Sequence, residues 1–160
     1  MSERGTELMS KALAQLDEAR GLLAEAHDSD LHRPYVDREG DHSANSVGNA
    51  ALHFVEGYQK IGRLLKGAGY VSASLTGETV QGNGHRHDHD HEAEITDVLK
   101  GLDAAKVRLT LLADLTDAQL DSIPPMKNQW ADGERTLLTV LDVIIAHQAG
   151  HLASLGDALG

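Results

Sequence analysis

The residues with the clearest chemistry lie in VLDVIIAHQAGHLASL, residues 140–155, where His147 and His151 stand four positions apart. Positions four apart on an α-helix differ by only about 40° around its axis, so both imidazoles face the same side. That side is apolar, because it also carries Val140, Ile144 and Leu155. Buried imidazoles need polar partners. Either they bond carbonyls or a neighbouring acid, or, as in zinc-binding helices with HExxH, both nitrogens meet one cation.

A third ligand is needed for a stable site, and His53 in NSVGNAALHFVEGYQKI is the candidate. It lies at the inner margin of the apolar stripe of a second predicted helix, and we expect Gly57, one turn later, to leave room beside its ring. The alternative is a histidine at the border of the bundle surface. Three neutral imidazoles with open positions suit Zn²⁺, Ni²⁺ or Fe²⁺, whereas Ca²⁺ and Mg²⁺ prefer oxygen.

Two polar residues near His53 are candidates for a catalytic role. Asn49 lies one turn before His53 and could orient a ligand by hydrogen bonding. Glu56 lies on the flank of the same helix and could act as a general base or hold a metal ligand in place. For Glu56 the solvated surface is the better interpretation, because charged flanks of amphipathic helices usually face water.

A second histidine cluster, GNGHRHDHDHE, places His85, His87, His89 and His91 in a polar, glycine-rich stretch at about residues 81–92. Such a segment could capture Zn²⁺, Ni²⁺ or Cu²⁺ weakly. It has no apolar scaffold to fix ligand geometry, so each binding event costs ordering entropy. We therefore favour a solvated loop over a functional metal-delivery loop.

Four segments have the apolar periodicity of amphipathic helices. We expect them over residues 5–27, from Asn45 or Ser46 to Lys66, over 93–114, and from 133–135 almost to the end. Polar stretches over 68–92 and 116–133 predict long connections after the second and third helices. The sequence thus predicts an all-α fold, a four-helix bundle in one domain over residues 1–160.

Composition narrows the function classes. There is no cysteine, so any metal is held by nitrogen and oxygen and any reacting thiol comes from solution. The formal charge of −11 argues against nucleic-acid and membrane-surface partners. The N-terminus MSERGTELMSK has no apolar signal region, and no apolar run approaches membrane-spanning length, which predicts a cytoplasmic protein.

The last helix has a second apolar stripe on the side opposite the histidines, made of Leu138, Leu141, Ile145, Ala149, Leu152 and Gly156. A bundle helix with water on its outer side does not need such a stripe. Either this helix is central and buried by both neighbours, or the stripe packs on a second copy in a two-fold dimer. We predict the homodimer.

The order of these histidines resembles that of a known family. GNAALHFVEGYQ on the second helix followed by HQAGH on the last, within 160 residues, is similar to the DinB/YfiT-like superfamily of four-helix-bundle metalloproteins. The resemblance implies a metal triad of His53, His147 and His151. It also implies activation of a low-molecular-weight thiol in some members. The Gly-Gln often found after the last histidine is replaced here by Ala153-Ser154, which weakens any transfer of substrate contacts.

Two functions follow from these observations. The first is a metal-dependent enzyme acting on a small-molecule substrate, with a low-molecular-weight thiol or water as nucleophile, hence a thiol S-transferase or a hydrolase. The alternative is a non-catalytic, stress-associated metal-binding protein, in which the loop histidines matter as much as the triad.

Overall fold

The computed structural model describes residues 2–36, 46–70 and 94–159, and the His85–His91 cluster lies outside these ranges. The four long helices are α1 (Glu3–Ala24), α2 (Val47–Gly67), α3 (Ile95–Leu109) and α5 (Leu137–Leu159). Three short helical segments accompany them: η1 (Asp28–His32), η4 (Thr110–Asp114) and α4 (Asp117–Asp121). The all-α prediction is confirmed.

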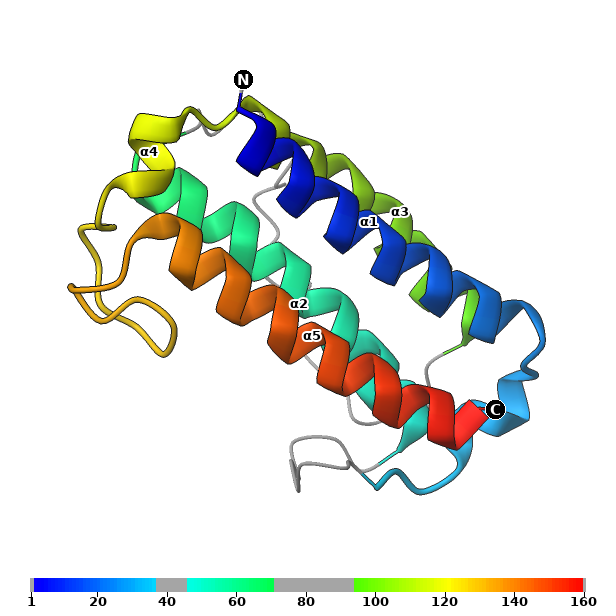
Figure 1. Ribbon diagram of the computed structural model, residues 1–160. Helices are drawn as coiled ribbons and strands as arrows, with labels where there is room; N and C mark the ends of the chain where they lie inside the picture. Colours follow the sequence, from blue (N-terminus) through cyan, green and yellow to red (C-terminus); the bar gives the residue numbers. More distant parts are fainter. Residues whose placement is uncertain (1, 37–45, 71–93, 160) are drawn as a thin grey trace.

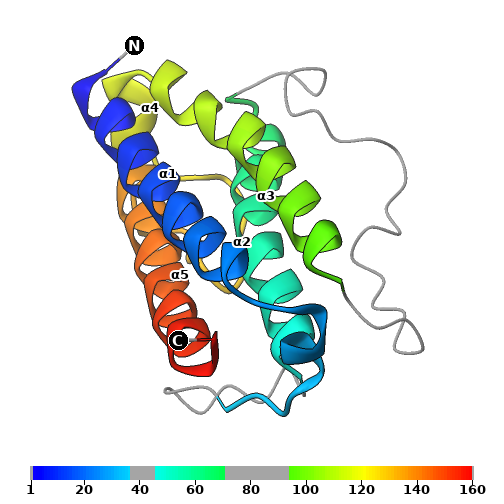
Figure 2. The same cartoon turned by 90° about the vertical axis from the view of Figure 1, so that its right-hand side faces the viewer.

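The long helices form a bundle in which each packs on two others (Figures 1 and 2). α2 lies between α3 and α5, and α1 contacts α3 and α5 from the other side. α1 and α5 run in one direction, and α2 and α3 run in the other (Figure 1). Parallel neighbours such as α2 and α3 cannot be joined by a short turn, which explains the long polar stretch between them in the sequence. α2 and α5, which carry the three histidines, are antiparallel neighbours.

The core is built from the predicted stripes. The inward-facing residues of α2 and α3 are at most 2% exposed: Val47, Ala51, Phe54, Tyr58, Ile61 and Leu65 on α2, and Val98, Leu102, Ala105 and Leu109 on α3. With so few aromatic residues, the interior relies on Leu, Ile, Val and Ala, and Phe54 and Tyr58 stack edge to face at its centre. Burial of this apolar surface provides the main driving force for folding.

α1 and α2 begin at capping residues, whereas the predicted end of α1 and the predicted start of α5 differ from those in the structure. Ser2 and Ser46 are the N-caps of α1 and α2, each accepting a backbone N–H three residues on. The prediction for α2 is confirmed, but α1 ends at Ala24, short of residue 27, where the chain turns into η1. α5 begins at Leu137 rather than at 133–135, because Asp132 and Gly133 form a turn, with Gly133 at φ +83°.

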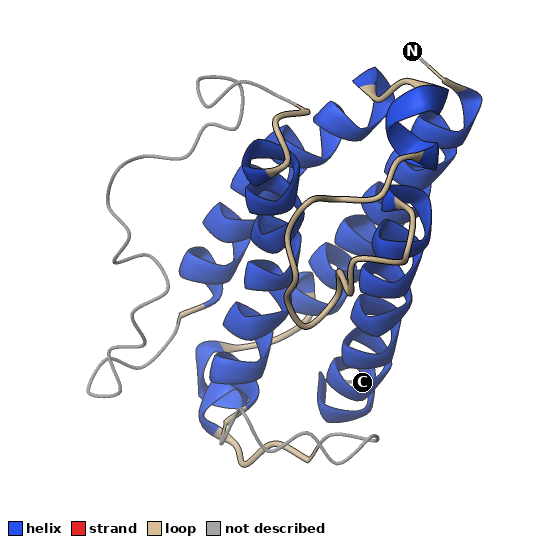
Figure 3. Ribbon diagram, turned by 90° about the vertical axis from the view of Figure 1, so that its left-hand side faces the viewer, coloured by secondary structure: helices blue, strands red, loops and turns tan. Residues whose placement is uncertain are grey.

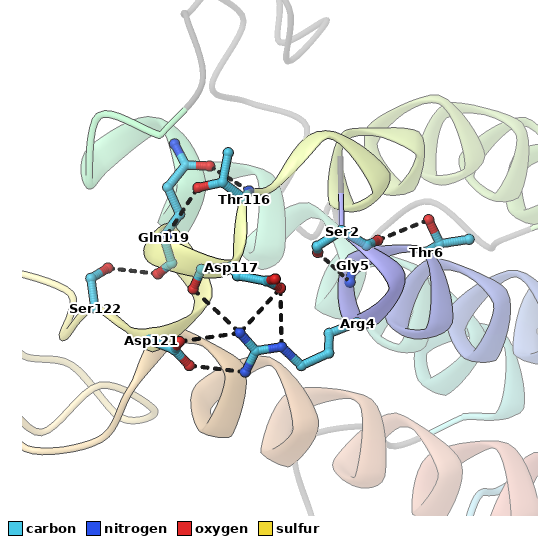
Figure 4. A network of polar contacts seen from close by, with 9 residues as sticks. All are labelled: Ser2, Arg4, Gly5, Thr6, Thr116, Asp117, Gln119, Asp121 and Ser122. Carbon is cyan, nitrogen blue, oxygen red and sulfur yellow. Dashed lines mark hydrogen bonds and ion pairs between the residues drawn. The ribbon is translucent and has the colours of Figure 1, made fainter.

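A correction concerns residues 116–133, which we predicted as a loop. The Thr116 hydroxyl accepts from the Gln119 N–H, while the Gln119 side chain accepts from the Thr116 N–H, a reciprocal capping box that starts α4. Arg4 of α1 clamps this short helix by bonding Asp117 and both carboxylate oxygens of Asp121 (Figure 4). The hydrogen bonds from Arg4 lower the pKa of Asp121.

A second correction concerns α5. We expected no apolar run of membrane-spanning length, but α5 is long and apolar enough to cross a membrane by length and composition alone. The bundle accounts for that composition: Leu141, Ile145 and Leu152, the chief members of the outer stripe, are all at most 5% exposed. The structure thus shows that α1 and α2, its two neighbours in the bundle, bury this part of α5. The homodimer stays a prediction, and a two-fold contact through this stripe would have to use its remaining members, of which Ala149 is exposed and Leu138 and Gly156 are half-buried.

Candidate metal site

The rings of His53, His147 and His151 lie together between α2 and α5. The ring centroids of His147 and His151 are 4.3 Å apart, and those of His53 and His151 are 5.4 Å apart. His151 is buried, with 8% of its surface exposed, whereas the other two are half-buried. The rings of His53 and His147 thus both lie beside the ring of His151, and exposure increases from His151 to the other two.

The rings of His147 and His151 are hydrogen-bonded to each other. Nε2 of His147 and Nε2 of His151 share a hydrogen bond of 2.8 Å, so one nitrogen carries the proton and the other accepts it. Two nitrogens bound to one tetrahedral zinc, each about 2.0–2.1 Å from it, lie roughly 3.3 Å apart. Within the ranges that the structure describes, no three or more acidic or histidine side chains lie where they could hold a metal ion. The donor chemistry fits a borderline-soft cation, but these two rings would have to separate by roughly half an ångström.

A buried polar network holds α1, α2 and α5 in register beside the histidines. Gln148, 1% exposed, follows His147 and donates from Nε2 to the carbonyl of Phe54. The hydroxyl of Tyr58 donates to Gln15 Oε1 over 2.7 Å, and Gln15 Nε2 donates to the carbonyl of Ile145 over 2.9 Å. Burial raises the pKa of the Tyr58 hydroxyl, an effect that a hydrogen bond with Gln148 partly offsets. Tyr58 thus stays a neutral donor, and the network fixes the two helices that carry the site.

Trp130 covers the cluster from the loop between α4 and α5. Its ring centroid is 4.9 Å from that of His147. The loop is held by the side chain of Asn128, whose Oδ1 accepts the N–H groups of Trp130 and Ala131, each over 2.8 Å. Arg135 adds a bond of 3.2 Å to the carbonyl of Trp130. Trp130 is not among the site residues predicted from the sequence; its being the single tryptophan, in a predicted loop, is the signal that could have marked it.

Beside Trp130 lies a cavity of about 310 Å³, within the usual range for small-ligand pockets. It is bounded by α2, by the first half of α5 and by the loop between α4 and α5, drawn in tan in Figure 3. Its apolar wall consists of Leu64, Met126, Trp130 and Ile144. Trp130 therefore adjoins both this cavity and the imidazole of His147.

Comparison with known families shows to which family the chain belongs. The family described as the DinB superfamily matches residues 14–155, a span that contains all three histidines and the loop with Trp130. The chain belongs to the DinB superfamily. No curated protein and no solved structure matches it. Membership confirms the resemblance seen in the sequence and agrees with the helical fold.

In this DinB-superfamily protein the position of Gly57 differs from our expectation. We predicted free space beside His53, but the amide of Gln148 fills it. A Cβ added at Gly57 would lie 2.2 Å from Oε1 and 2.5 Å from Nε2 of that amide. Gly57 thus permits the close approach of α2 to the buried Gln148.

We predict that Gly57→Ala lowers the free energy of unfolding by about 1–3 kcal/mol, because the added methyl group displaces a buried, hydrogen-bonded amide. Gly21→Ala in α1 is the matched control, since nothing lies within 4 Å of its Cβ position. That change should raise the free energy of unfolding by about 0.5–1 kcal/mol through helix propensity. Urea unfolding measures both. The same sign for the two variants would contradict the packing described for Gly57.

Asn49 and Glu56 flank His53 on α2, as the spacing predicts. Both side chains are half-buried, and the backbone N–H of Asn49 is committed to the Ser46 cap over 3.1 Å. Their catalytic roles remain predictions.

Proposed function

We propose that this protein holds one divalent transition-metal ion through His53, His147 and His151 and uses it in a thiol S-transferase or hydrolase reaction. The observation that carries the proposal is the convergence of three imidazoles from two antiparallel helices, with the ring of His151 5.4 Å or less from each of the other two. Zn²⁺, Ni²⁺ or Fe²⁺ matches neutral nitrogen donors.

When bound, such an ion acts as a Lewis acid that lowers the pKa of a thiol or water in its open positions. The residues of the chain would then have four tasks. The histidines would supply nitrogen donors and leave part of the coordination sphere open. Trp130 screens one edge of the cluster from bulk water. Glu56 is a candidate to accept a proton, and Asn49 a candidate to orient the incoming group. Because the chain has no cysteine, the thiol must be a separate molecule.

The cavity of about 310 Å³ beside Trp130 favours an enzyme over a protein that only stores metal, because storage needs no space for a second molecule. The test combines zinc-loaded protein, a low-molecular-weight thiol such as glutathione, and 1-chloro-2,4-dinitrobenzene. In that reaction sulfur bonds to the ring carbon and chloride leaves. A parallel assay follows hydrolysis of 4-nitrophenyl acetate without thiol. We expect at least one rate above background with wild type and background rates with His147→Ala. Equal rates for both proteins would contradict catalysis at this site.

The alternative, a non-catalytic metal-binding protein, makes a different prediction. A metal store would take up several weak equivalents of zinc and lose most of them when residues 84–92 are deleted. The enzyme would keep one tight equivalent in that deletion variant. Equilibrium dialysis of the two proteins separates the functions.

A further inference from the structure

The cavity beside Trp130 contains positive charge in an acidic protein. Of the described residues that line it, two are charged, Lys60 and Arg63, and both are cations. They stand three positions apart on α2, so their side chains are neighbours on the helix surface. In a chain of formal charge −11, a lining whose described members include two cations and no acid points to a ligand that carries negative charge.

The polar and apolar walls of the cavity are separated. Leu64 and Ile144 are buried and form its inner part, whereas Arg63 is exposed and Lys60 half-exposed, at the outer part. The amide side chains of Asn128 and Gln129, both exposed, complete the polar rim. A ligand that matches this arrangement has an apolar body directed inward and one anionic group at the rim.

We infer that this cavity binds a small organic anion, a compact apolar body with a single carboxylate or phosphate group held by Lys60 and Arg63. Arginine and lysine both recognise these groups through charge-assisted hydrogen bonds. None of the three histidines is among the described residues that line the cavity, so we expect the anion to bind without a metal. The ligand acts as a substrate only if the proposed function holds, because only then does the neighbouring His147 belong to a reactive centre.

Trp130 makes the inference directly measurable. It is the single tryptophan of the chain and forms part of the cavity wall, so its fluorescence reports occupancy. The probes are 3-phenylpropanoate and 3-phenylpropan-1-ol, which share the same body and differ in charge. We expect the acid to bind at least about tenfold more tightly than the alcohol, a difference of about 1.4 kcal/mol. The preference should shrink as salt is added, because the rim is open to solvent.

A double variant, Lys60→Gln with Arg63→Gln, should reduce the affinity for the acid to that for the alcohol. The control is Lys100→Gln with Lys106→Gln, which makes the same charge change on exposed positions of α3 and should keep the preference. A third probe, 3-phenylpropyl phosphate, carries a phosphate group in place of the carboxylate. Comparing its affinity with that of 3-phenylpropanoate shows which of the two anionic groups the cavity prefers. Equal binding of acid and alcohol to wild type, a preference that survives in the double variant, or no binding of any probe would overturn the inference.

All measurements are repeated with chelator-treated wild type and with His53→Ala. The inference predicts an unchanged preference in both, whereas the proposed function predicts loss of activity in both. Failure of one claim is thereby distinguished from failure of the other.

Discussion

Replacing His53 with alanine is expected to weaken zinc binding by at least about 100-fold. Removing a hydrogen-bond partner outside the coordination sphere already costs 10–100-fold in known metal sites, and loss of a ligand exceeds that. In the proposed site His53 is also the one donor from α2, so without it the site would reduce to a pair on one helix. Isothermal titration with zinc, in a background lacking residues 84–92, gives the dissociation constant without interference from the second histidine cluster.

The same loss is expected for His147→Ala and His151→Ala. His27→Ala is the control, because it removes an exposed imidazole at the start of η1 while leaving the three site histidines in place. Its zinc affinity should match that of the unsubstituted protein. Tight binding retained in His53→Ala would remove α2 from the site and reduce the proposal to the pair of histidines on α5.

Zinc is expected to stabilise the fold strongly, because an ion shared by α2 and α5 binds the folded chain and cross-links its two antiparallel neighbours. At a free zinc concentration 1,000 times the dissociation constant, linkage predicts about 4 kcal/mol of added free energy of unfolding. Urea unfolding of the variant without residues 84–92, with and without zinc, measures this quantity. Deleting that cluster limits zinc binding to the unfolded chain, which would reduce the effect.

Calcium at the same concentration should leave the unfolding curve unchanged, because three imidazoles offer no oxygen ligands. His151→Ala should lose the zinc effect while keeping a cooperative transition, since the apolar core described above does not depend on that ring. Equal zinc stabilisation in wild type and His151→Ala would show that the ion acts elsewhere on the chain.

Helical periodicity explains how much of the site could be predicted. A period of 3.6 residues decides which side chains share a face, and two faces that both turn inward must meet. His147 and His151 follow from that rule alone, and His53 follows from its place at the edge of the α2 stripe. The hydrogen bond between the rings of His147 and His151 does not follow from periodicity, because it depends on side-chain rotation rather than on register.

Other features depend on contacts between segments that are distant in the chain, and helical periodicity does not predict such contacts. The position of Trp130 is set by an Asn128 turn, not by a helix face. Gln148 fills the space at Gly57 because α2 and α5 approach closely there. The capping box of Thr116 and Gln119 could have predicted the short helix α4. We predicted a loop there because Pro124 and Pro125 follow in the sequence. The connection predicted over 116–133 does line the cavity, but the two cations of the cavity come from α2.

The central claim is that imidazoles from two helices hold one ion, and the position of the ion tests it most directly. Crystals of the zinc-loaded protein, measured at the zinc absorption edge, would show the metal as an anomalous-difference peak. The account predicts one strong peak about 2.0–2.1 Å from a ring nitrogen of each of His53, His147 and His151. A peak that contacts the α5 pair but not His53, or no peak between the two helices, would contradict it.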